Sequence, residues 1–126
     1  MRKWQQMVQA FHEKAGAVVN HKPTQPDANT QILRLTLIDE ETIELDDALG
    51  IGDLVEIADA LGDLLYVVLG TAVTCGIDIE PIFEEIHRSN MSKFIDGYRR
   101  EDGKWIKGPS YSPANLEPIL KNQASI

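Results

Sequence analysis

Residues 53–76 read DLVEIADALGDLLYVVLGTAVTCG, and this stretch decides the fold. Most of it is Leu, Val, Ile and Ala, and its internal charges are three acids, Glu56, Asp59 and Asp63. A segment this long and this apolar predicts a helix that is buried around most of its circumference, begun by Asp53 and ended by Gly76. Other helices must therefore cover it.

The flanking segments predict three more helices. Apolar residues recur at helical spacing over residues 3–20, and the two prolines of HKPTQP (21–26) end that helix. Asp27 is a suitable N-cap for a second helix over 28–49. The last of the three is expected from Ile79 to about residue 96.

After Gly97 the chain becomes rich in Gly, Pro and charge. This composition predicts an irregular tail over 97–126 that lies on the bundle, with a short helix after Pro118. No segment alternates as a strand would. The expected fold class is therefore all-α, a four-to-five-helix bundle in a single domain over residues 1–126.

Charge is segregated along the chain. Between Leu35 and His87 there are fourteen Asp and Glu residues and no Lys or Arg, whereas both flanks are basic. The formal net charge of −8 argues against binding to a nucleic-acid duplex, which needs clustered cations. An acidic middle between basic ends suits an anionic ligand that is held partly by metal and partly by the flanking cations.

The lone Cys75 is compatible with a reducing compartment, and we see no signal peptide. The apolar run from Leu64 to Ile77 is shorter than the ~20 residues of a membrane span. We therefore expect a soluble cytoplasmic protein that does not bind membranes. The apolar circumference of the 53–76 helix exceeds what one chain would cover, which predicts a homodimer or a dimer of dimers.

The acids fall on helix faces that could meet. Helical spacing places four residues in one sector of the 28–49 helix, with Glu40 toward its edge: Arg34, Leu37, Glu41 and Glu44. On the next helix, Glu56, Asp59 and Asp63 share a side. If the two helices pack antiparallel, carboxylates from both reach one site, and Mg²⁺ or Mn²⁺ are its natural occupants. Buried acids need compensation from metal, from the basic flanks or from solvent.

Four stretches resemble a known family: DEETIEL (39–45), ADALGDLLYVVLG (58–70), GIDIEPIFEEIHRSNMSK (76–93) and DGKWIKGPSY (102–111). They are similar to the all-α nucleoside triphosphate pyrophosphohydrolases, in the MazG-like branch akin to dimeric dUTPases. The resemblance implies Mg²⁺- or Mn²⁺-dependent hydrolysis of the bond between the α and β phosphates of a (d)NTP, with dUTP or dGTP among the first substrates to consider.

The resemblance also implies site residues. Glu40, Glu41 and Glu44 match its E-E-x-x-E motif, and Asp63 matches the aspartate of its E-x-x-D motif. Ala60 stands where that second motif has Glu, so Asp59 or Glu56 must supply the missing acid. We expect the metal ligands to be Glu41, Glu44, Asp59, Asp63 and Glu56. Glu40 and Glu44 are the candidates to accept a proton from the attacking water.

Cations should complete the clamp on a triphosphate. The resemblance marks Asn90 and Lys93 as phosphate contacts. Lys104 and Lys107 lie in a Gly- and Pro-containing loop that could close over the nucleotide. Arg34 has two equal interpretations, a substrate contact or an internal salt-bridge partner of the acids.

Two other classes of function compete with hydrolysis. The first is a non-catalytic helical bundle whose acidic face binds divalent ions or a basic protein partner. The second is a ferritin-like oxidase, because Glu84 to His87 is an E-x-x-H motif. A di-iron bundle needs two such motifs and this chain has one, so the oxidase is disfavoured.

Overall fold

The computed structural model describes residues 2–125 and confirms an all-α fold. Over that range the elements are α1 (Arg2–Ala15), α2 (Ala28–Ile51), α3 (Leu54–Cys75), α4 (Ile79–Met91), a 3-10 helix (Ser92–Phe94), β1 (Tyr98–Arg99), β2 (Trp105–Ile106) and α5 (Glu117–Ala124). The chain forms two compact units, one ending at Ile79 and one beginning at Glu80.

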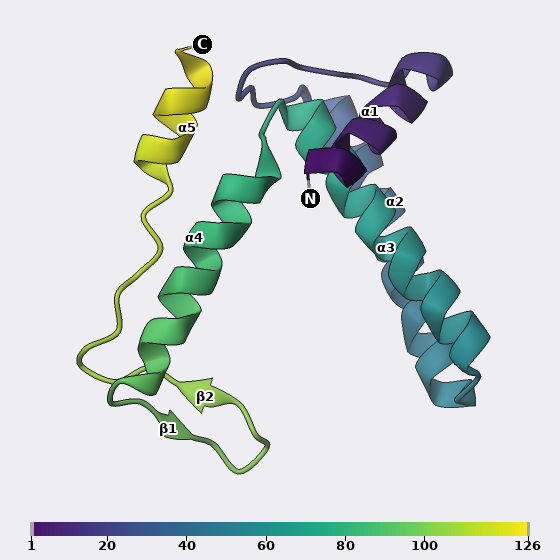
Figure 1. The fold of residues 1–126 in the computed structure, drawn as a ribbon. Coiled ribbons are helices and arrows are strands. Elements are labelled where there is room, and N and C mark those ends of the chain that lie inside the picture. The colour runs from purple at the N-terminus through teal and green to yellow at the C-terminus, as the bar shows by residue number, and fades with distance from the viewer. Residues whose placement is uncertain (1, 126) are drawn as a thin grey trace. The chain divides into compact units, whose positions relative to one another are not determined.

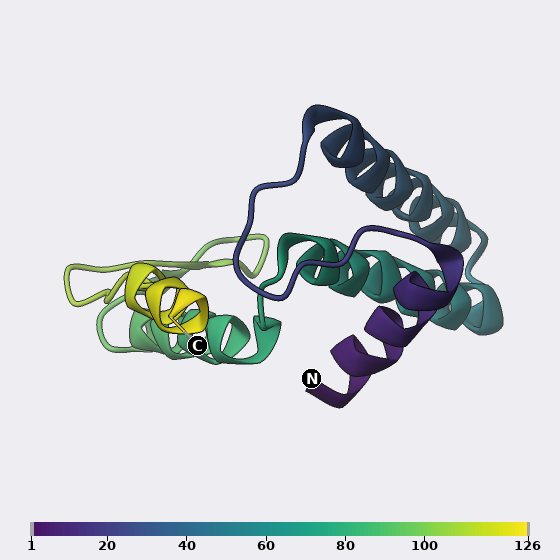
Figure 2. The same ribbon diagram turned by 90° about the horizontal axis from the view of Figure 1, so that it is seen from above.

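In the first unit, α3 lies between α1 and α2 (Figures 1 and 2). Its ends are the predicted ones: the Asp53 carboxylate accepts hydrogen bonds from two backbone N–H groups of the first turn, and Gly76 follows in the left-handed conformation. Asp27 caps α2 similarly, accepting from the Thr30 N–H at 2.8 Å. Local capping chemistry therefore fixes where α2 and α3 begin and where α3 ends.

Burial of α3 is incomplete. Val8, Leu69 and Val73 form the core cluster near its C-terminal end. Helices α1 and α2 pack on it and the connection between them lies against its C-terminal end, which leaves part of its circumference uncovered by the described residues, as expected of a helix too apolar for one chain to cover. Several large apolar side chains of α3 remain exposed, among them Leu61, Leu65 and Val68. Tyr66, expected in the core, is 40% exposed.

By length and composition, α3 is the one helix within residues 2–125 that could cross a membrane, with 22 residues and a mean hydropathy of 1.5 in its most apolar window. The helix is longer than the apolar run from Leu64 to Ile77, so the expectation of a segment too short to span does not hold. Core helices of soluble proteins meet the same criteria. A third of that window, 33%, is buried inside the structure.

The connection from α1 to α2 lies against the C-terminal end of α3. Helix α1 ends five residues earlier than predicted, because Gly16 adopts a left-handed φ of 72°. The backbone N–H groups of Asn20 and Thr24 then donate to α3 carbonyls at 3.2 and 2.8 Å. At Gly76 a Cβ atom would lie 2.1 Å from the carbonyl oxygen of Lys22, so this approach requires glycine.

The second unit contains an element that the sequence did not predict. Helix α4 stops at Met91, short of the expected residue 96, and continues as the 3-10 helix. Tyr98 and Arg99 then pair antiparallel with Ile106 and Trp105. Strands of two residues are too short to produce a detectable alternation, so the sequence pattern could not indicate this hairpin. The short helix expected near Pro118 is confirmed as α5.

A charged pair fastens the chain that runs back along α4 (Figure 1). Arg88 donates to both Glu85 carboxylate oxygens at 2.7 and 2.8 Å, and to Ser112 Oγ at 3.0 Å and the Pro113 carbonyl at 3.2 Å. The Asn115 N–H donates to Glu85 Oε2 at 2.8 Å. Arg88 chiefly, with that N–H, lowers the pKa of Glu85 to about 2.

Acid should release this segment. Because the folded pKa is lowered, the stabilisation from Glu85 is complete above its ordinary value of 4.5 and is lost as pH falls toward about 2. We expect the Asn115 amide resonance to stay constant from neutral pH to about 4.5 and to move only below it. Glu85→Gln should abolish that titration and speed amide exchange at Asn115, while Glu84→Gln, at an exposed neighbour, should do neither. A titration of the Asn115 amide at the ordinary Glu pKa would contradict the assignment.

Candidate metal centre

Carboxylates from α2 and α3 converge where the two helices pack. Single oxygens of Glu41, Glu44 and Asp63, here called the acid cluster, all lie within 4.8 Å of one another. Glu41 and Glu44 are about one turn apart on α2, and α3 supplies Asp63 from the facing side. The structure thus brings together three of the acids that the sequence singles out.

Glu41 is the most constrained member. Its side chain is half-buried, and Oε2 is buried without a hydrogen-bond partner within residues 2–125. Burial raises the pKa of Glu41, and so do a hydrogen bond with Glu44 and the charges of Glu44, Asp63 and Glu40. A buried acceptor without a donor is unfavourable. The cluster is therefore destabilised by its own charge unless a cation joins it.

The donor set fits a hard divalent cation. Carboxylate oxygens at this spacing are the ligands that Mg²⁺, Mn²⁺ and Ca²⁺ prefer. The partnerless Oε2 of Glu41 is an oxygen that such an ion would satisfy. Exposed acids often gather without binding metal. Glu41 differs from such acids because its Oε2 is buried and has no hydrogen-bond donor among the described residues.

The other predicted acids lie outside the acid cluster. Glu56 and Asp59 border a separate pocket of about 400 Å³, together with Glu44, Asp47, Ala48, Ile51 and Ala60. Ala60 is 4% exposed. Glu44 belongs to the acid cluster and also borders this pocket. Glu56 and Asp59 therefore share a pocket with one member of the cluster. Glu40 is exposed on α2 beside Glu41.

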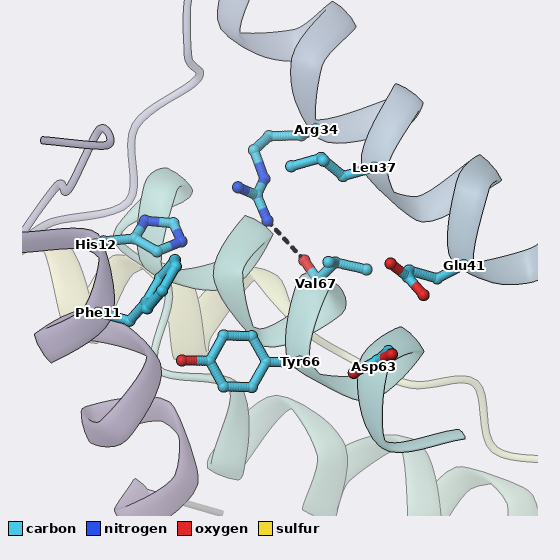
Figure 3. A pocket seen from close by; sticks show the side chains of 8 residues that line it. All are labelled: Phe11, His12, Arg34, Leu37, Glu41, Asp63, Tyr66 and Val67. Atoms are coloured by element: carbon cyan, nitrogen blue, oxygen red, sulfur yellow. Dashed lines mark hydrogen bonds between the residues drawn. The ribbon is translucent and has the colours of Figure 1, made fainter. Parts of the chain in front are cut away.

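A second pocket of about 310 Å³ adjoins Glu41 and Asp63 (Figure 3). Its other lining residues are Phe11, His12, Arg34, Leu37, Tyr66 and Val67, and we call it the α1–α3 pocket. The rings of Phe11 and Tyr66 meet edge to face, with centroids 5.8 Å apart. Sequence reasoning missed these two as site residues. Tyr66 follows Asp63 by three residues, so helical spacing already placed it beside the acids.

Arg34 is buried at 7% exposure. Its Nη2 donates to the Val67 carbonyl at 2.9 Å, and its Nε donates to Thr71 Oγ1 at 3.2 Å. Among residues 2–125 it forms no ion pair, so the interpretation of Arg34 as a salt-bridge partner of the acids is wrong. Burial lowers its pKa, which still leaves arginine charged.

The remaining predicted contacts belong to the second unit. Asn90 is exposed near the end of α4, and Lys93 is half-buried in the 3-10 helix. Lys104 is exposed in the hairpin turn. Lys107 Nζ lies 5.2 Å from the centre of the Tyr111 ring.

A match to a known family, and not the fold alone, places the protein in the all-α nucleoside triphosphate pyrophosphohydrolase, or MazG-like, superfamily. Residues 8–90 match the phosphoribosyl-ATP pyrophosphohydrolase (PRA-PH) family, and the chain belongs to that family. The family is described by a nucleotide pyrophosphohydrolase activity, and its members are typically dependent on a divalent metal.

One curated relative comes from Acanthamoeba polyphaga mimivirus and is described as "Uncharacterized protein L479". It is 41% identical over 91 residues, covering 70% of this chain and 36% of the viral protein. The chain thus spans little more than a third of the relative that it matches.

Proposed function

We propose that this protein hydrolyses a (d)NTP to a (d)NMP and pyrophosphate, with Mg²⁺ or Mn²⁺ as cofactor, in the manner of the branch akin to dimeric dUTPases. The observation that carries the proposal is the acid cluster with its buried, partnerless Glu41 Oε2. Family membership supplies the reaction class.

Glu41, Glu44 and Asp63 would hold the ion, and Glu56 and Asp59, beyond Glu44, are the candidates for a second one. A bound divalent ion neutralises phosphate charge and acidifies water. The oxygen of a water bonds to the α-phosphorus while the bond to the bridging oxygen breaks, and pyrophosphate leaves. Glu40 or Glu44 accepts the proton of that water.

The phosphates need more positive charge than the ion provides. Our candidate phosphate contacts are Asn90 and Lys93, whose role the family resemblance implies, and Lys104 and Lys107, whose Gly- and Pro-containing loop could close over the nucleotide. Arg34 is a substrate contact at the pocket beside the cluster.

We further propose a soluble, cytoplasmic homodimer or homotetramer in which each chain acts as a single domain, without affinity for membranes or nucleic-acid duplexes. Support for self-association comes from the large apolar side chains exposed on α2 and α3, including Ile32, Leu33, Leu35, Ile43, Leu61, Leu65 and Val68. Light scattering should give two or four times the chain mass of 14.1 kDa.

Pyrophosphate release from a dNTP panel that includes dUTP and dGTP, with Mg²⁺ or Mn²⁺, tests the activity. Cleavage that stops with a chelator and in Asp63→Asn is the expected result. A protein that binds Mn²⁺ but cleaves no nucleotide would instead be the non-catalytic acidic bundle.

A further inference from the structure

A buried cation without an acidic partner lines the α1–α3 pocket. Arg34 and Glu41 are both on α2, seven residues apart, which is about 10 Å along a helix axis. Figure 3 shows the Arg34 guanidinium between His12 and Val67, with Glu41 and Asp63 beyond Val67. The pocket therefore has an acidic, metal-suited end and a cationic end.

The guanidinium has unused capacity. Arginine carries five N–H donors, and two of those of Arg34 are used: Nε donates to Thr71 and one Nη2 N–H donates to Val67. Thr71 Oγ1 in turn donates to the same Val67 carbonyl at 3.0 Å, which fixes the acceptor that orients Arg34. Within residues 2–125, the other N–H groups of the guanidinium fork have no protein acceptor among the hydrogen bonds of Arg34, and none of its nitrogens is a buried atom without a partner, so they are available to a ligand in the pocket.

His12 and Gly70 define the surroundings of that fork. His12 is 3% exposed, and its Nδ1 lies 3.2 Å from the Val18 carbonyl, so the Nδ1–H tautomer donates there. Burial and the Arg34 charge both lower the pKa of His12, which leaves a neutral ring whose Nε2 is an acceptor. A Cβ atom on Gly70 would lie 2.4 Å from Arg34 Nη2 and 2.9 Å from His12 Nε2. Both side chains therefore lie over α3 at Gly70.

The walls between the two ends are apolar or aromatic: Phe11, Leu37, Tyr66 and Val67. Such walls suit a planar ring and are unfavourable for a phosphate. The Arg34 end is thus suited to the edge of a base, and the acid cluster to the phosphates.

We propose that the α1–α3 pocket is the nucleobase subsite and that Arg34 selects bases with a keto oxygen. An arginine fork pairs with two adjacent acceptors, as guanine presents with O6 and N7, whereas adenine replaces O6 with an amino donor. For the pyrimidines the fork can use a single hydrogen bond: uracil presents the acceptor O4 where cytosine presents an amino donor, so uracil is favoured over cytosine. This inference rests on the proposed function, since it assumes that the ligand is a nucleotide.

The test is competition between dGTP and dATP, and between dUTP and dCTP, read as ratios of kcat/KM. We expect the wild type to favour the keto base of each pair by about tenfold or more. Arg34→Lys keeps the charge but loses the fork, and should reduce both ratios by about tenfold. Gly70→Ala, which displaces the fork from α3, should reduce them in the same direction. Arg2→Lys, on exposed α1 surface, should leave them unchanged.

Calorimetric binding of dGMP and dAMP provides a readout that does not depend on turnover. A wild type that prefers the amino bases, or ratios unchanged in a folded Arg34→Lys, would overturn the inference. If circular dichroism shows that Arg34→Lys does not fold, the kcat/KM ratios of Gly70→Ala serve as the test instead. If no triphosphate is cleaved but dGMP binds in an Arg34-dependent way, the proposed hydrolysis fails and the base subsite stands.

Discussion

Glu41→Gln is expected to lower kcat/KM for nucleotide hydrolysis by about a hundredfold or more, and at the same time to raise the thermal stability of the metal-free protein. The loss follows from removing one charged ligand of the acid cluster. The gain follows because the amide removes a carboxylate that burial and neighbouring charges disfavour. A purely structural role for Glu41 would predict the opposite change in stability.

The effect of pH on this gain has a definite sign. Because the pKa of Glu41 is raised, the favourable contribution of its protonated form is complete below the ordinary value of 4.5. It is lost as pH rises through the raised pKa. In a chelator, the wild-type Tm should therefore fall relative to that of Glu41→Gln as pH rises from acid toward neutral.

Thermal melts with a chelator and with Mn²⁺ provide the measurement. Mn²⁺ should raise the wild-type Tm, because binding at a hundred times the Kd adds about 2.7 kcal/mol to the free energy of unfolding. The Tm of Glu41→Gln should rise far less. Asp46→Asn, at an exposed position of the same helix, serves as the matched control. If Asp46→Asn shows the same pattern, the effect belongs to net charge and not to the cluster.

Gly76→Ala is expected to destabilise the first unit by about 3 kcal/mol or more. Its φ of 66° is unfavourable for a residue with a side chain, and the added Cβ would lie 2.1 Å from the Lys22 carbonyl oxygen. That oxygen is backbone, and the hydrogen bonds of Asn20 and Thr24 to α3 hold the segment in place. Urea unfolding followed by circular dichroism measures the loss.

Two other glycines separate the causes. Gly52 has a similar φ of 79° but nothing within 4 Å of an added Cβ, so Gly52→Ala should cost about 1–2 kcal/mol from conformation alone. Gly62 lies in α3 with equally open space, and Gly62→Ala should stabilise by about 0.5–1 kcal/mol. Equal losses at Gly76 and Gly52 would show that the contact with Lys22 is unimportant.

The helices could be predicted because their signals are local. Asp27, Asp53 and Gly76 act through the backbone groups of their own helix ends, so sequence spacing suffices to find them. The hairpin could not be predicted, since two paired residues on each side leave no periodic pattern. The sequence predicted an α3 too apolar for one chain to cover, but not which of its side chains stay exposed, because periodicity reports which faces are apolar and not what covers them.

The acids of the candidate site were accessible to sequence reasoning and the pocket was not. Glu41, Glu44 and Asp63 meet because helical spacing puts them on sides of α2 and α3 that face each other where the two helices pack. The pocket beside them depends on α1, whose angle to α3 has no sequence signature. Only contact geometry reveals that Gly70 gives room to Arg34 and His12, two side chains from different helices.

The partnerless oxygen of Glu41 has a practical consequence for protein engineering. Variants selected from a library for heat resistance without added metal would be enriched in neutral substitutions at Glu41, and hence in inactive protein. A mutation that removes this acid would likewise not destabilise the metal-free protein, so degradation of unfolded protein would not remove the variant. Screens on this scaffold should therefore include a divalent ion at every stage, so that stability and activity are selected together.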